Sequence, residues 1–184
     1  MTIDSAPQED LRQGDICELD LFPHWNLDTA FTVSRGSGAT HLQLPAMPKV
    51  LPSKLHPDRS LAVVCSYDCD LENPRERTGL LIAPVFALSE KNERYDLIVR
   101  SADLQVSEDG QKFFNYLQYF PLEVGHVTCV NTVMGVVDFS AITSLGKATA
   151  AVQLLKDRKI HELADEQRIA FRAKLATFVG RPGS

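Results

Sequence analysis

The chain has 184 residues, of which 44% are hydrophobic and 23% charged, and its formal net charge is -5. These values are typical of an ordinary globular chain, long enough to bury a core in one domain or in one domain with an appendage. The mildly acidic balance excludes a bulk electrostatic attraction to nucleic acid, although a local basic groove is compatible with it.

The N-terminal stretch MTIDSAPQEDLRQGD is polar and lacks the apolar centre of a signal peptide. No apolar run approaches the roughly 20 residues that a membrane-spanning helix needs. We therefore expect a cytoplasmic protein that does not enter a membrane. Its cysteines are then reduced thiols, and since no two of them form a CxxC pair, the standard zinc and thioredoxin signatures are absent. The four cysteines are Cys17, Cys65, Cys69 and Cys129.

The first elements are read from turn residues and apolar alternation. Residues 1–12 are expected to be a flexible N-terminus, and Gly14-Asp15 makes a turn into a strand that begins at Ile16. The prolines of residues 22–60 argue against a long helix there. A hairpin across Gly36-Ser37-Gly38 is predicted, with strands at 30–34 and 39–44.

Two apolar segments, SLAVVCS and GLLIAPVFAL, are predicted to be central strands with both faces covered. Five of their residues are expected in the core, namely Val63, Val64, Leu81, Ile82 and Val85. Residues 102–112 have the composition of a surface loop. Further strands, rich in β-branched and aromatic residues, are expected within 94–101, 112–122 and 126–139.

The C-terminal segments 146–163 and 164–182 have helical composition. In the second, Asp165 is expected to cap the start, and Gly180 with Pro182 to end the helix. Phe171, Leu175 and Phe178 fall on one helical stripe that must be covered.

Strands come first and helices last in this order of elements. This order predicts an α+β fold, mainly an antiparallel β-barrel or a strongly curved sheet, with C-terminal α-helices. The expected organisation is a flexible N-terminus at 1–12, a β-barrel domain at 13–140, and a C-terminal helical appendage at 141–184 packed on the barrel.

The strand sequences QGDICELDL, LAVVCS and GLLIAPVF resemble the PemK/MazF toxin family over residues 13–88. That resemblance implies a small, often dimeric SH3-like barrel that cuts RNA without a metal, in a bacterial toxin-antitoxin or defence context. In the family, an arginine before the second strand and a threonine after the third carry the chemistry. Arg59 lies near the first position but one residue further out, and Phe86, which carries no exchangeable proton, stands at the second.

The stretch LAVVCSYDCDLENP, residues 61–74, places thiols, carboxylates and a hydroxyl at the end of a predicted strand. A metal site of Asp68, Cys69 and Asp70 with a histidine departs from the ligand spacing of structural zinc. Cys69 lies between two carboxylates, whereas a reactive cysteine favours cationic neighbours. On an extended chain, Asp68 and Asp70 share one side and could bind a basic group or share a proton.

The simplest reading of this stretch is turn chemistry, with Cys65 as a small core residue. The end of a strand is nevertheless a common position for binding groups. The candidate catalytic residues are therefore Arg59, Ser66, Asp68, Cys69 and Asp70. His24, Trp25 and Asn73 are the candidate ligand-binding residues, and no metal or cofactor is predicted.

These observations favour a binding or regulatory protein, with a protein partner, a second copy of the chain or RNA as its ligand. A metal-independent endoribonuclease of the PemK/MazF type, using Arg59 with groups from residues 66–70, is the alternative. A structural subunit that docks a partner through its C-terminal helix is the third interpretation.

Overall fold

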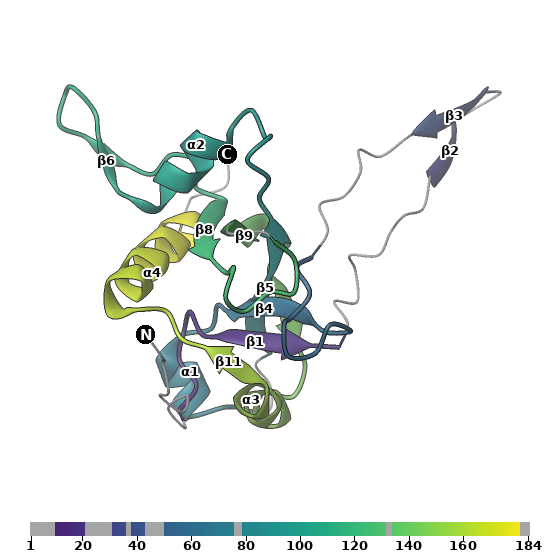
Figure 1. Ribbon diagram of the computed structural model, residues 1–184, viewed down its shortest axis with the longest axis vertical. Coiled ribbons are helices and arrows are strands. Elements are labelled where there is room, and N and C mark those ends of the chain that lie inside the picture. The colour runs from purple at the N-terminus through teal and green to yellow at the C-terminus, as the bar shows by residue number, and fades with distance from the viewer. Residues whose placement is uncertain are drawn as a thin grey trace.

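The computed structural model describes residues 10–20, 31–35, 38–42, 50–75, 79–131 and 134–180. Its main feature is a seven-stranded sheet with helices on both sides (Figure 1). The strands of this sheet are β1 (Ile16–Leu19), β4 (Ser60–Val64), β5 (Leu80–Ala87), β8 (Tyr119–Glu123), β9 (Met134–Asp138), β10 (Thr143–Leu145) and β11 (Lys159–His161).

Two small hairpins stand outside that sheet, β2 (Phe31–Arg35) with β3 (Gly38–Leu42), and β6 (Gln105–Val106) with β7 (Lys112–Phe113). The first confirms the predicted hairpin. The helices of the described residues are α1 (Asp68–Glu72), α2 (Tyr95–Val99), α3 (Ala148–Asp157) and α4 (Asp165–Val179), with short 3-10 turns η1 (Arg100–Ala102) and η2 (Phe139–Ala141). Within these residues, no helix has both the length and the apolar character needed to cross a bilayer.

The sheet is antiparallel throughout but does not close. Its strand order is β11-β1-β4-β5-β9-β8, and β10 pairs with the first part of β5. The α+β class and the antiparallel pairing are confirmed, whereas no closed barrel forms in the described part of the chain. Helices cover both faces, so the sheet buries its apolar residues as a middle layer and does not need to curl onto itself.

Alternation along the central strands divides the interior into two cores. Leu61 and Val63 of β4 face one core, which α4 covers with Phe171 and Leu175. Ala62 and Val64 face the other core, which is covered chiefly by α3. Figure 1 shows α3 and α4 on opposite sides of β1, as this alternation requires.

Four of the five predicted core residues are buried, and Leu81 is the exception. Its side chain is 39% exposed, whereas Leu80 and Ile82 on either side of it are at 1%. Leu81 pairs with Ser144 of β10, a short strand that lies off the main order of the sheet. The expectation that β5 is covered on both faces is therefore wrong at its first residues.

Residues 94–101 form helix α2 and the turn η1 instead of the predicted strand. Their β-branched and aromatic composition is overridden because Ile98 is buried in a third core beside Phe86 and Val136. The predicted strand at 126–139 shortens to β9, because residues 124–131 form a loop that pairs with residues 52–54.

The C-terminal segment contributes strands as well as helices. Residues 146–163, expected to be helical, form α3 and then strand β11, which pairs with β1 along an edge of the sheet. Strand β10, which directly precedes residues 146–163, also belongs to the sheet and pairs with β5. The described residues 141–180 thus contribute two strands to the sheet and do not only pack upon it.

Helix α4 confirms the predicted apolar stripe. The ring of Phe171 lies 5.2 Å from that of Phe120 and 5.4 Å from that of Phe139, both edge-to-face, and Phe178 packs against the same core. The helix ends at Val179 with Gly180 as its C-cap, as expected. Ala164 occupies the N-cap, however, and Asp165 is the first helical residue, so the predicted cap is wrong.

Candidate functional site

The sequence-predicted catalytic residues stand at opposite ends of one strand. Arg59 directly precedes β4, and Ser66 follows it. Seven residues of extended chain span roughly 23 Å, at about 3.3 Å each. The structure therefore does not bring Arg59 together with residues 66–70, and the two ends of β4 must be considered separately.

At the C-terminal end of β4, the chain enters a helix sooner than predicted. Asp68, Cys69 and Asp70 form the first turn of α1, with Leu71 as its buried residue. Residues two positions apart in a helix are separated by about 200° around its axis, so Asp68 and Asp70 face different directions. The expectation that they share one side of an extended chain is wrong.

Asp68 and Ser66 are engaged in holding the fold. The Oδ1 atom of Asp68 accepts a hydrogen bond of 2.8 Å from the backbone N–H of Gln13, and its Oδ2 atom forms an ion pair with Arg172 of α4. The hydroxyl oxygen of Ser66 accepts a 2.8 Å hydrogen bond from the backbone N–H of Leu81. Both side chains tie α1 and the end of β4 to other segments.

The other predicted residues at this end are Cys69, Asp70 and Asn73, all of them exposed. Asn73 is the C-cap of α1, and its backbone N–H donates to the carbonyl of Cys69 at 3.1 Å. Cys65 is buried, and burial raises the pKa of its thiol far above the ordinary value. Cys65 is thus the small core residue that turn chemistry predicted.

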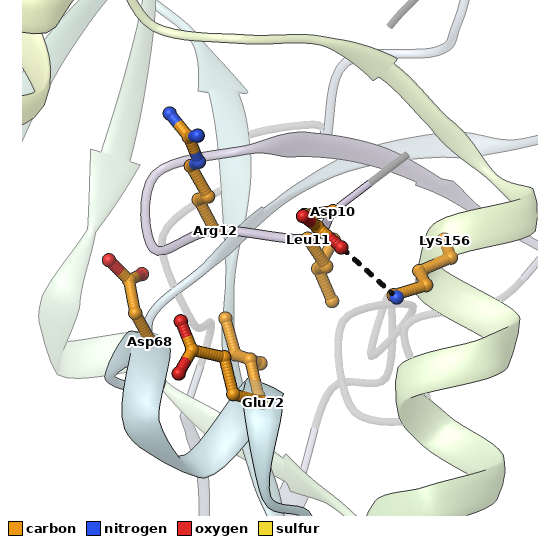
Figure 2. Close-up of a pocket in the computed structure, with 7 residues that line it drawn as sticks. Asp10, Leu11, Arg12, Asp68, Glu72 and Lys156 are labelled. Carbon is orange, nitrogen blue, oxygen red and sulfur yellow. Dashed lines mark ion pairs between the residues drawn. The ribbon is translucent and has the colours of Figure 1, made fainter. Parts of the chain in front are cut away.

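A small pocket of about 110 Å³ lies beside α1. Figure 2 shows Asp68 and Glu72 on α1, Asp10 and Arg12 on the segment that leads to β1, and Lys156 on α3. Lys156 forms an ion pair of 3.7 Å with Asp10. Sites for small molecules usually occupy about 300–1,000 Å³. Asp68 therefore lines a depression, whereas Cys69 and Asp70 do not, and the depression is too small for a nucleotide.

A buried ionic network fixes the turn that precedes β1. The carboxylate of Asp15 lies 2.9 Å from Nζ of Lys159 and 3.0 Å from Nη1 of Arg168, and all three side chains are almost fully buried. Gly14 adopts a positive φ of 95° and donates its N–H to Val64 at 2.8 Å. The QGD sequence at 13–15 therefore joins β1, β4, β11 and α4.

The N-terminal end of β4 carries a different polar cluster, centred on Glu18 of β1. Glu18 pairs with Leu61 of β4 and is buried on the same face as Ile16, a position that alternation would assign to an apolar residue. Its Oε2 atom lies 2.6 Å from Nδ1 of His56 and 3.2 Å from Nη1 of Arg59. Its Oε1 atom accepts a hydrogen bond from the hydroxyl of Ser53.

The geometry assigns the imidazole tautomer. A carboxylate only accepts hydrogen bonds, so in the neutral imidazole Nδ1 of His56 carries the proton that is donated to Glu18, and Nε2 has the lone pair. The His56 side chain is 49% exposed. No described residue forms a hydrogen bond with Nε2.

Arg59 also keeps part of its guanidinium available. Its Nε atom donates to Asp20 at 3.0 Å, and its Nη1 atom donates to Glu18. Arg158 also binds Asp20, at 2.6 Å, and this hydrogen bond is the largest cause of the lowered pKa of Asp20. Among the described residues, none binds Nη2 of Arg59, and the side chain is 26% exposed.

Backbone hydrogen bonds hold the loop that carries His56 and Arg59. Ser53 donates its N–H to Arg59 at 2.9 Å, and Arg59 donates to His56 at 2.9 Å. The neighbouring loop is attached through Lys54, whose N–H donates to Val127 at 2.9 Å. The imidazole and the guanidinium are therefore positioned before any ligand arrives.

Together these groups make an acid–base arrangement. A carboxylate orients an imidazole whose second nitrogen faces outward, and a guanidinium lies beside it, where it can donate to an anion. We call Glu18, Ser53, His56 and Arg59 the Glu18 cluster.

Of the sequence-predicted residues, only Arg59 belongs to the Glu18 cluster. His24 and Trp25 lie outside the described residues. Sequence reasoning did not select Glu18 or His56 as site residues, although a glutamate on the apolar face of a strand was a readable signal. Comparison of the chain with protein-family models, with curated proteins and with solved structures found no match.

Proposed function

We propose that the protein is a metal-independent, cytosolic endoribonuclease whose active site is the Glu18 cluster. The observation that carries this proposal is the 2.6 Å contact between buried Glu18 and half-exposed His56, with Arg59 on the same carboxylate. The resemblance of residues 13–88 to PemK/MazF toxins suggests RNA as the substrate and a toxin or defence context, although Phe86 stands where that family has its catalytic threonine. The ion pair of Asp68 with Arg172 and its hydrogen bond from Gln13 support a structural role for the opposite end of β4.

In this proposal, His56 moves the proton. Its Nε2 atom takes the proton of a ribose 2′-hydroxyl, and the resulting oxygen attacks the adjacent phosphorus. The bond from phosphorus to the 5′-oxygen breaks, and the imidazolium returns its proton to that oxygen. The products are a 2′,3′-cyclic phosphate and a 5′-hydroxyl. Glu18 stabilises the imidazolium while it exists.

Arg59 supplies the positive charge in this reaction. Its Nη2 atom donates to a non-bridging phosphate oxygen, where negative charge increases in the transition state. Its other donors remain on Glu18 and Asp20, which keep the guanidinium in place. A guanidinium in this position provides the charge stabilisation that a metal ion supplies in other nucleases.

The test is cleavage of a mixed-sequence RNA oligonucleotide in the presence of EDTA, with identification of the terminal groups. We expect 2′,3′-cyclic phosphate ends, and no cleavage of the 2′-deoxy oligonucleotide. His56→Ala and Arg59→Ala are expected to lower the rate by about 10²-fold or more. Asp70→Asn, at the opposite end of β4, is the matched control and should keep the wild-type rate.

An inactive wild-type protein, or a His56→Ala variant with the wild-type rate, would refute the proposal. Binding of the RNA without cleavage, weakened by Arg59→Ala, would instead define a binding module that uses the same surface. That outcome corresponds to the first interpretation of the sequence.

A further inference from the structure

Two histidines outside the Glu18 cluster face one another. His126 lies in the loop between β8 and β9, and His161 is the last residue of β11. The Nε2 atom of His126 is 3.3 Å from Nε2 and 3.4 Å from Nδ1 of His161, and the ring centroids are 4.5 Å apart. His126 is exposed and His161 is half-buried, so solvent reaches the pair.

We propose that His126 and His161 form a binding site for a divalent transition-metal ion of the zinc class. Two nitrogens bonded to a tetrahedral zinc at about 2.05 Å stand about 3.3 Å apart, so imidazoles this close together can reach one ion. The two rings meet edge to face, and the His161 ring must rotate before the lone pairs of both imidazoles point to that ion. Either nitrogen of His161 can serve, because rotation of its ring about the Cβ–Cγ bond presents one or the other. Imidazole is a preferred ligand of zinc, copper and nickel.

The backbone holds both ligands in place. His161 pairs with Ile16 in the sheet. The turn that carries His126 is closed by the N–H of Val127, which donates to Val124 at 2.9 Å. The backbone around both histidines therefore requires little ordering when the metal binds.

The pair supplies two protein ligands, and water supplies the others. In the described part of the chain, no group of three or more His, Cys, Asp and Glu side chains could hold a metal ion. Glu162, next to His161, is directed to Lys159 at 2.5 Å and to Arg168 at 3.8 Å.

A metal at this pair would connect the loop of residues 124–131 to β11. The same loop holds the segment before His56, through Val127 to Lys54 and through Thr128, whose hydroxyl donates to Pro52 at 3.0 Å. The metal site is therefore adjacent, along the backbone, to the loop of the Glu18 cluster. Its existence does not depend on the proposed nuclease activity, because it rests on other residues.

The test is calorimetric titration of the tag-free protein with zinc chloride in a buffer that does not chelate zinc. We expect one zinc ion per chain, and a loss of affinity of at least tenfold in His126→Ala and in His161→Ala. His56→Ala and Cys129→Ser are the controls, since they remove another exposed histidine and the exposed thiol nearest in sequence to His126. Both should bind zinc within twofold of the wild-type affinity.

Zinc binding that survives in His126→Ala, or that is lost in Cys129→Ser or in His56→Ala, would overturn the proposal, as would a wild-type protein that binds no zinc. His126 is exposed, so its variant is expected to fold and decides the question even if His161→Ala does not. Circular dichroism of each variant verifies that it is folded before titration.

Discussion

The two ends of β4 carry polar clusters of similar size but opposite character. At the C-terminal end, Asp15 and Asp68 each bind cations from the C-terminal half of the chain, and these bonds join segments far apart in sequence. At the N-terminal end, Glu18 binds His56 and Arg59, each of which keeps a nitrogen that no described residue binds. At the C-terminal end, the donors without a partner among the described residues, Nε of Arg168 and Nε of Arg172, are buried. At the N-terminal end, the free nitrogens belong to partly exposed side chains, which a ligand can reach.

The difference also appears in exposure. The side chains around Asp15 are nearly excluded from solvent, so their charges interact strongly and must be balanced within the protein. His56 and Arg59 reach the surface while the carboxylate that orients them is buried. Such a gradient from a buried anchor to an exposed reactive group is typical of catalytic sites.

Asp15→Asn is expected to have the largest effect on stability. It keeps the shape of the side chain but removes the fully buried one of the two carboxylates that Lys159 and Arg168 share, so that only the partly exposed Glu162 remains. We expect the free energy of unfolding to fall by about 3–5 kcal/mol in chemical denaturation. Asp10→Asn is the control, because Asp10 is 84% exposed and its ion pair with Lys156 is 3.7 Å long. A loss below about 1 kcal/mol in Asp15→Asn would show that this network is not a stabilising one.

Glu18→Gln tests the opposite end of β4. The amide keeps the volume of the carboxylate but no longer compensates the charge that His56 acquires during proton transfer. We expect RNA cleavage to fall by about 10²-fold, which corresponds to about 2.7 kcal/mol of transition-state stabilisation. The measurement is single-turnover cleavage with the enzyme in excess. Unchanged cleavage would remove Glu18 from the active site.

Asp68→Asn should affect stability without affecting activity. It weakens the hydrogen bond from Gln13 and the partly exposed ion pair with Arg172, so a loss of about 1–2 kcal/mol is expected in thermal or chemical melts. The rate of RNA cleavage should equal that of the wild type. A stable variant with reduced cleavage would move the active site to α1.

Cys65 predicts a dependence of stability on alkaline pH. Its folded pKa is raised by burial, so the thiol stays protonated in the folded state while it ionises in the unfolded state. The contribution of this thiol to the free energy of unfolding is complete below the pKa of the thiol in the unfolded chain. It is lost as the pH rises above that pKa, by about 1 kcal/mol between pH 9 and 10. Cys17 contributes in the same direction. Denaturation of Cys65→Ala at both pH values should show a smaller decline than the wild type, and an equal decline would contradict this assignment.

Cys69→Ser and Asp70→Asn should have the smallest effects. Both residues are exposed on α1, and neither faces the Glu18 cluster across the length of β4. Stability should change by less than about 0.5 kcal/mol, and RNA cleavage should be unchanged. Loss of cleavage in either variant would restore the C-terminal end of β4 as the functional one.

The local features of the chain were predictable from sequence. The buried character of Val63 and Val64, the turn at Gly14, and the stripe of Phe171 and Leu175 on α4 follow from apolar periodicity and glycine conformation. These properties depend on residues close together in the chain, and they also determine the α+β class. Arg59 was selected through the resemblance to PemK/MazF toxins, in which an arginine precedes the second strand.

The contacts between distant segments were decided only by tertiary structure. Residues 159–161 become a strand because β1 offers an open edge and Asp15 offers a buried partner to Lys159. The helical form of residues 68–72 depends on Gln13 and Arg172, which lie more than 50 positions away in the chain. Glu18 meets His56 across 38 residues, and His126 meets His161 across 35. Periodicity in a sequence reports which face of an element is buried, but it does not report which polar groups the packing of those faces brings together.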